Sequence, residues 1–198
     1  YNIYKTNLET GGRSFGVAYF NNGLIYSKSQ SPEFNIKTTF YDVSFAEKEN
    51  DSVFKEGTSY SGDLNRSFYE GAPTITGDGK TMYYTGNASE RTVYRESKRN
   101  KKQYEISSVG INILKIYKVE LTDSGWVNRV TLPFCSNEFS CTHPSVSKDG
   151  KTLYFVSDMK GGQGGYDVYV SHKTDSSWSA PKNLGASINT NANEMTPF

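Results

Sequence analysis

Residues 143–193 have the pattern of one complete four-stranded antiparallel unit, and this unit recurs along the chain. A proline opens its first expected strand, and Asp149-Gly150 supplies the residues with positive φ that a tight hairpin needs. The later strands are rich in Tyr, Val and Phe, which suit a pleated and half-buried surface. The unit therefore predicts four short strands, at 144–147, 153–157, 166–171 and 178–185.

A second copy of this unit begins at Glu70 and keeps the same internal spacing. Pro73 and Pro144 open equivalent strands, and each is followed six residues later by a hairpin glycine. Trp126 and Trp178 each lie nine residues after a strand tyrosine. Since equal positions in a repeat have equal surroundings, we expect both tryptophans to pack between neighbouring units.

The spacing of the copies predicts the fold class. They are separated by 56, 71 and 53 residues, and repeats of about 40 to 50 residues with four strands each are typical of β-propeller blades. No stretch keeps apolar residues at helical spacing for three turns. We therefore predict an all-β chain that forms one incomplete β-propeller domain. The expected blades are 16–62, 70–135 and 143–190, with 1–15 and 194–198 belonging to neighbouring blades and Pro197 beginning a fourth copy.

The second unit is longer because of an insertion of 19 residues between its second and third strands. The insertion is polar and basic, so we expect an exposed loop. Its run from 91 to 102 has six basic residues and one acidic residue. This run is either a solvated loop or a docking surface for an acidic partner. The basic residues are Arg91, Arg95, Lys98, Arg99, Lys101 and Lys102.

Composition excludes several classes of function. The 22 basic and 21 acidic side chains leave a net charge of +1, which gives no global field to attract nucleic acid or an anionic membrane. No apolar run approaches the roughly 18 residues of a transmembrane helix. There is no Gly-x-Ser-x-Gly motif, and the two histidines, His143 and His172, have no motif partner. We therefore predict a protein that is not an enzyme and that uses no cofactor or metal.

The glycine-rich connection from 157 to 167 is the first candidate binding site. Backbone groups and two carboxylates there offer ligands for a cation or an anion. In the alternative interpretation, the glycines follow a tight path and each aspartate caps a turn. The oxygens lack the regular spacing of calcium motifs, and the glycines lack the Lys-Ser/Thr end of a phosphate-binding loop. The candidate residues are Asp158, Gly161, Gly162, Gly164, Gly165 and Asp167.

Cys135 and Cys141 lie six residues apart in the connection between the second and third units. In an oxidising compartment they would close a small ring through a disulfide. The alternative is a pair of free, small core residues. A zinc site would need a fourth ligand besides these cysteines and His143, and only His172 is present elsewhere.

Three segments, at 70–85, 114–134 and 136–198, carry a family resemblance. The wording P-x-[VI]-[ST]-x-DGKT-[LM]-Y-[FY] resembles WD40-like, TolB-type propeller repeats. Together the segments resemble the propeller region of OmpA-family, peptidoglycan-associated outer-membrane proteins of Bacteroidota. That group includes the PorE-like component of the type IX secretion and gliding machinery. The resemblance covers residues 15–198, and it does not include the cysteines or the basic insertion.

The resemblance implies a periplasmic, outer-membrane-associated scaffold that is not an enzyme. Its expected partners are envelope proteins, namely barrel proteins or lipoproteins of a secretion complex, and not nucleic acid. Peptidoglycan would be bound only through a separate OmpA-like domain, which these 198 residues do not contain. The alternative is a glycan-binding or glycan-active propeller. Hydrolysis would require two carboxylates about 5 to 10 Å apart in a central cleft.

Overall fold

A computed structural model shows that the described part of the chain is built from β-strands. These strands form three four-stranded antiparallel sheets and one two-stranded hairpin, so the prediction of an all-β chain is confirmed. In this part of the chain no helix is long and apolar enough to cross a membrane. The described residues are 6–8, 14–29, 41–60, 63–65, 69–88 and 113–197, with the backbone of 92–95 and 102–105.

Each sheet follows the order of the chain, with every strand antiparallel to the next. The first sheet contains β1 (Ser14–Phe20), β2 (Gly23–Ser29), β3 (Tyr41–Glu47) and β4 (Thr58–Ser59). The second contains β5 (Glu70–Ile75), β6 (Thr81–Asn87), β9 (Leu114–Thr122) and β10 (Gly125–Thr131). The third contains β11 (Cys141–Val146), β12 (Thr152–Ser157), β13 (Asp167–His172) and β14 (Lys182–Asn183).

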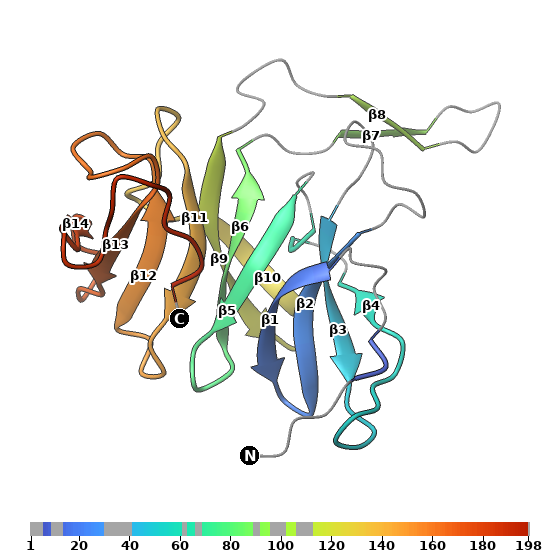
Figure 1. The fold of residues 1–198 in the computed structure, drawn as a ribbon. Coiled ribbons are helices and arrows are strands. Elements are labelled where there is room, and N and C mark those ends of the chain that lie inside the picture. Colours follow the sequence, from blue (N-terminus) through green and yellow to red (C-terminus); the bar gives the residue numbers. More distant parts are fainter. Residues whose placement is uncertain are drawn as a thin grey trace.

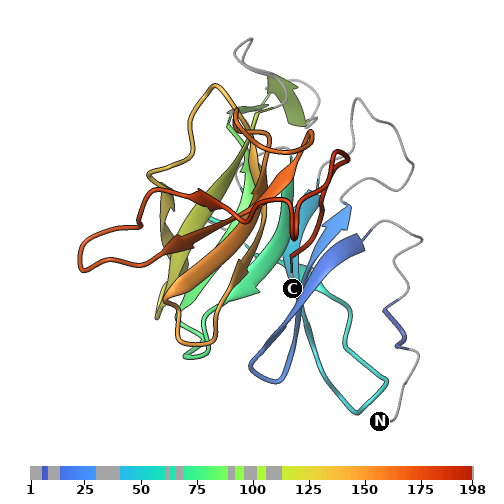
Figure 2. The same cartoon turned by 60° about the vertical axis from the view of Figure 1, so that its left-hand side comes forward.

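The sheets stand side by side, and their first strands lie against one another. β1 contacts β5, and β5 contacts β11, so these three strands form the inner side of the array (Figure 1). Thr196 and Pro197, near the C-terminal end of the chain, lie on this same side, and Figure 2 shows the chain returning there. Among the described residues the sheets do not close into a ring. The sheets extend over 14–59, 70–131 and 141–183, and the blade boundaries expected from the sequence stay a prediction.

The insertion in the second sheet forms a separate hairpin. It contains β7 (Thr92–Arg95) and β8 (Lys102–Glu105), and it lies between β6 and β9 in the chain. β6 and β9 still pair directly, up to Asn87 and Leu114. Figure 1 shows β7 and β8 beyond the ends of the main sheet. The insertion therefore extends the loop without interrupting the sheet.

The second and third sheets use the same local device for their first hairpin. Gly79 and Gly150 have φ of 71° and 69°, values that glycine adopts without a steric penalty. Asp78 and Asp149 each accept the backbone N–H two residues later, at 3.0 Å, through Oδ1. The Asp-Gly pairs in the sequence thus determine these turns locally.

The two tryptophans pack between neighbouring sheets, which confirms the prediction from their spacing. Trp126, in the second sheet, lies 5.5 Å from the ring of Phe20 in the first. Trp178, in the third sheet, lies 5.8 Å from the ring of Tyr83 in the second, edge to face. Each tryptophan therefore joins its own sheet to the preceding one, where aromatic burial stabilises the array.

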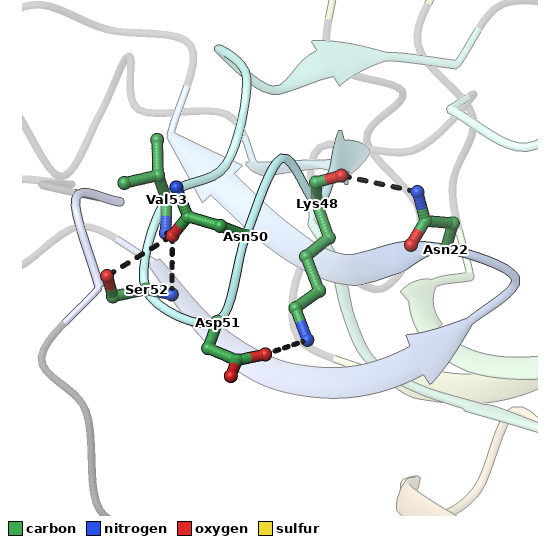
Figure 3. Close-up of polar contacts among 6 residues, drawn as sticks. All are labelled: Asn22, Lys48, Asn50, Asp51, Ser52 and Val53. Atoms are coloured by element: carbon green, nitrogen blue, oxygen red, sulfur yellow. Dashed lines mark hydrogen bonds and ion pairs between the residues drawn. The ribbon is translucent and has the colours of Figure 1, made fainter.

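A polar turn lies between β3 and β4 of the first sheet, at the repeat position where the other two copies have tryptophan. The Asn50 Oδ1 accepts the backbone N–H of Val53 at 3.0 Å, and the Lys48 ammonium pairs with Asp51 at 2.8 Å (Figure 3). The Asn22 side chain donates to the Lys48 carbonyl at 3.2 Å, which links the turn to the first hairpin. Local hydrogen bonds therefore replace the aromatic packing found at this position in the other sheets.

The short segment at 6–8 lies against the outer side of the first sheet. The Asn7 side chain donates to the Phe54 carbonyl at 2.8 Å and accepts the Phe54 N–H at 2.7 Å. Leu8 packs on a small cluster that contains Tyr26 and Ala46. Asn7 thus adds hydrogen bonds to the segment between β3 and β4. The assignment of residues 1–15 to a neighbouring blade stays a prediction.

Candidate functional site

The glycine-rich connection is built around the Asp167 carboxylate. This side chain is buried, and it accepts the backbone N–H of Gln163 at 2.5 Å and of Gly164 at 3.1 Å. The Asn183 amide donates a third hydrogen bond at 2.9 Å. Burial opposes ionisation, but these hydrogen bonds outweigh it and lower the pKa of Asp167. The carboxylate is therefore already satisfied by its own chain.

The glycines of this connection lie where a larger side chain would not fit. A Cβ on Gly162 would stand 1.9 Å from the Asp167 carboxylate, and one on Gly164 would stand 2.0 Å from the Ala192 carbonyl. Gly165 likewise faces the Asn193 side chain, and Gly161 has a φ of 94°. These contacts favour the interpretation of the loop as a tight structural path.

Asp158 accepts a hydrogen bond from a different segment of the chain than Asp167 does. Its Oδ1 accepts the backbone N–H of Ser140 at 2.7 Å, just before β11. Within the described residues no three His, Cys, Asp or Glu side chains are grouped as a metal site would require. The two carboxylates therefore have separate structural partners, and ligand binding by this loop stays a prediction.

The basic candidates fall largely outside the described residues. Arg95 and Lys102 are placed only by their backbone, as partners in the hairpin of β7 and β8. Their side chains, and all of Arg91, Lys98, Arg99 and Lys101, are not among the described residues. A docking surface on this insertion stays a prediction.

The two cysteines are free thiols in this structure, and no disulfide joins them. Cys141 is fully buried, and Cys135 packs against the same core cluster between the second and third sheets. His172 is placed elsewhere, with its Nδ1 3.3 Å from the Thr152 hydroxyl. The sequence-based prediction of a disulfide is therefore not tested by this reduced state.

A groove runs along the first strands of the three sheets. It has a volume of about 760 Å³ and is lined by β1, β5, β11 and the segment at 196–197. Val17 and Tyr19 on its border are 63% and 88% exposed, which is high for apolar and aromatic side chains. The first strands of all three sheets therefore line the groove.

Each first strand has the same backbone irregularity where it lines this groove. The pairing register shifts once in β1, once in β5 and once in β11. A bulge of this kind adds an unpaired residue and bends the strand. The bulge residues have φ values of 59° for Gly16, 46° for Ala72 and 49° for His143, and Thr196 repeats this with 48°.

The three residues other than glycine that have this positive φ are under backbone strain. Left-handed backbone costs about 1–3 kcal/mol in such residues, and a following proline disfavours helical backbone in the residue before it. Ala72, His143 and Thr196 are each followed by proline. Strained backbone of this kind clusters at functional sites. The recurrence of a positive φ on every inner strand, with strain at Ala72 and His143, makes the groove the candidate site.

Threonines of the second sheet hold the third sheet in place beside the groove. The Thr85 hydroxyl accepts the backbone N–H of His143 at 2.9 Å. The Thr74 hydroxyl accepts the N–H of Val146 at 3.2 Å. The first of these bonds satisfies the backbone N–H of the bulge residue His143, so its strained conformation is retained.

The groove is predominantly apolar. Its lining contains no Asp, Glu, Lys or Arg among the described residues, and its ionisable side chains are those of Tyr19 and His143. Burial lowers the pKa of His143, whose Nδ1 lies 2.9 Å from the Thr142 hydroxyl. The lining thus offers no carboxylate pair for glycoside hydrolysis, and it suits an apolar ligand.

The sequence interpretation missed this groove, although one signal for it was present. Pro73, Pro144 and Pro197 recur at the start of successive copies, and all three line the groove. Proline cannot donate to a ladder, so it is confined to strand edges and bulges. Its recurrence in the first strand of successive copies therefore indicated that each of these strands is an edge strand of its sheet.

We expect the stability of the protein to fall in mild acid because of His143. An unfolded histidine binds its proton near pH 6.5, whereas burial keeps His143 neutral to lower pH in the folded state. The free energy of unfolding should therefore decrease as pH falls through about 6.5. Urea unfolding at about pH 8 and about pH 5.5 measures this. His143→Asn should remove part of the decrease, and His172→Asn should not; equal behaviour of the two variants would contradict the assignment.

Comparison with known proteins gives a match at the level of fold only. No family model matches the sequence. No curated protein sequence matches either. A puromycin-hydrolysing peptidase of Mycobacterium tuberculosis matches over 91% of this chain, with 11% identity and a TM-score of 0.52. The chain spans 24% of that peptidase. TolB of Acinetobacter baumannii matches over 86% of this chain and 43% of its own, with 15% identity, but its TM-score of 0.38 is too low to support a shared fold.

The peptidase corrects one prediction made from the sequence. The chain was predicted not to be an enzyme because it has no catalytic motif. The same arrangement of sheets occurs within a peptidase chain, so the exclusion of enzymes was wrong. At 11% identity the likeness concerns the fold and not the activity.

Proposed function

We propose that the three sheets are consecutive blades of a β-propeller, and that this propeller is a protein-binding module. The recurrent bulge at Gly16, Ala72 and His143 supports equivalent inner strands around one axis. Thr196-Pro197 repeats the same positive φ before proline and lines the same groove. This repetition supports a further inner strand at the C-terminal end of the described chain. The likeness to the peptidase fold is consistent with such an array.

The proposed ligand is an apolar segment of a partner protein that binds in the groove. The observation that carries this proposal is the exposure of Val17 and Tyr19 on the border of a cavity without charged side chains in its described lining. Tyrosine is enriched at the centres of protein interfaces because it buries a large area and still offers a hydroxyl. Proline in the lining adds apolar surface without an unsatisfied N–H.

The proposed setting is the periplasm, at the outer membrane. The resemblance to OmpA-family, PorE-like proteins supports partners among barrel proteins and lipoproteins of a type IX secretion or gliding complex. Peptidoglycan binding would belong to a separate OmpA-like domain. The near-neutral charge of this chain is consistent with a protein partner and not with nucleic acid.

Site-specific photo-crosslinking in the source cells tests this function. A photoreactive phenylalanine derivative at position 19 should capture an outer-membrane barrel protein or lipoprotein, identified by mass spectrometry. The same group at Tyr154, which is 40% exposed on β12 and outside the groove lining, is the matched control. Val17→Ser should weaken capture about tenfold, as expected for loss of a central apolar contact. Equal capture from both positions, or capture of glycan alone, would contradict the proposal.

A further inference from the structure

Two free thiols meet in the core between the second and third sheets. Cys135 lies in the connection from β10 to β11, and its N–H donates to the Leu132 carbonyl at 3.0 Å, which fixes the turn before the thiol. Cys141 opens β11 and pairs with Ser157 of β12, with its sulfur 4.0 Å from the Ser157 hydroxyl. Both side chains pack on one cluster that includes Phe155.

The two sulfurs have different surroundings. The Cys141 thiol, the backbone of Ile116 and the Lys115 charge all act on the Cys135 sulfur. These interactions lower the pKa of Cys135 and favour its thiolate. Cys141 is 0% exposed, and its hydrogen bond to Cys135 together with burial raises its pKa. Cys135 is only partly buried, so reagents in solution reach it first.

We propose that Cys135 and Cys141 form a thiol–disulfide exchange site, in which Cys135 attacks a small disulfide and Cys141 resolves the product. Both cysteines pack on the same core cluster, which places the resolving residue near the attacking one. Solvent access to Cys135 alone determines the order of the two steps. This inference is independent of the function proposed for the groove.

The oxidant in this reaction is a low-molecular-weight disulfide such as oxidised glutathione. The Cys135 thiolate attacks one sulfur of the reagent, the S–S bond of the reagent breaks, and the released thiolate takes a proton from water. Cys141 then loses its proton and attacks the Cys135 sulfur, which releases the second glutathione as a thiol. Two protein thiols are oxidised to one disulfide, and one reagent disulfide is reduced to two thiols.

The resulting ring would contain the seven residues 135–141 and would constrain the connection between the two sheets. Its end at Cys141 lies two residues before the bulge at His143. Oxidation would therefore act next to a strained inner strand of the groove.

The test is to incubate the folded chain with oxidised glutathione, alkylate it and map the cysteines by mass spectrometry. Wild type should lose two hydrogens and leave no thiol for alkylation. Cys141→Ser should accumulate one glutathione on Cys135, whereas Cys135→Ser should remain unmodified while folded. An adduct on Cys141 in preference to Cys135, or two thiols that stay alkylatable in wild type, would overturn the proposal.

A measurement on the unaltered protein covers the case in which the Cys141 variant does not fold. Brief alkylation of reduced wild type should label Cys135 before Cys141, with a ratio of at least about tenfold, because only the former combines access with thiolate character. Equal labelling of the two residues in the native state would contradict the assigned order.

Discussion

Gly16→Ala is expected to lower the free energy of unfolding by about 3 kcal/mol, from left-handed strain and overpacking together. A Cβ at this position would lie 2.6 Å from the Cα and 2.7 Å from the nitrogen of Ala72. Both are backbone atoms of the adjacent inner strand, so no side-chain rotation relieves the clash. β1 and β5 would have to separate at the groove. Urea unfolding followed by tryptophan fluorescence measures the loss, since Trp126 lies between these sheets.

Two further variants separate the clash from the backbone strain. Gly79 has a similar φ of 71°. The nearest neighbour of a Cβ added there would be a Phe20 ring carbon at 3.7 Å, which is an ordinary contact. Gly79→Ala should therefore cost only about 1–2 kcal/mol. Ala72→Gly relieves the backbone strain at position 72, but it should leave the additional loss caused by Gly16→Ala unchanged, because the clashing Cα and nitrogen remain. Equal losses at Gly16 and Gly79, or no loss from Gly16→Ala when it is measured in the Ala72→Gly background, would refute the close approach of the two strands.

Asp167→Ala should also destabilise the protein by about 3 kcal/mol, because a buried charged acceptor is removed from three donors. The backbone N–H groups of Gln163 and Gly164 and the Asn183 amide would lose their partner. The loop and the last strand of the third sheet should then open together. Urea unfolding gives the overall loss, and amide hydrogen exchange at Gln163 and Gly164 reports the local opening.

The pH dependence gives Asp167 a second signature. Its pKa is lowered in the folded state, so the stability it contributes is present above about pH 4 and is lost as the pH falls below that value. Asp149→Ala is the control, because that carboxylate also accepts a backbone N–H but lies on an exposed hairpin. Its substitution should cost much less and leave hydrogen exchange in the glycine-rich loop unchanged. An equal effect from Asp149 would show that burial of Asp167 is unimportant.

Local sequence features predicted the first three strands of the third sheet to within three residues, whereas the fourth, expected at 178–185, is only Lys182–Asn183. Asp149-Gly150 determines its hairpin through a side-chain acceptor two residues away and a glycine with positive φ. The equal spacing of Trp126 and Trp178 predicted their packing between sheets, because each depends on one position of a repeat. The insertion was also placed correctly between the second and third strands of its sheet.

The candidate site was harder to predict because its parts come from distant segments. Asp167 was identified as a candidate ligand residue, but its saturation by Asn183 depends on how the last strand returns to the loop. The positive φ of Ala72 and His143 has no local cause, since alanine and histidine before proline normally avoid it. Hydrogen bonds such as that from His143 to Thr85, 58 residues away, hold this conformation.

By itself, the sequence determined the all-β class, the four-strand period and the turns, because each depends on residues close together in the chain. The tertiary structure decided that the inner edges of three sheets meet at one groove. It also decided that Gly16 lies against the backbone of Ala72 and that Cys135 and Cys141 pack on one core cluster. These features arise from packing between sheets, where residues far apart in sequence exclude or satisfy one another.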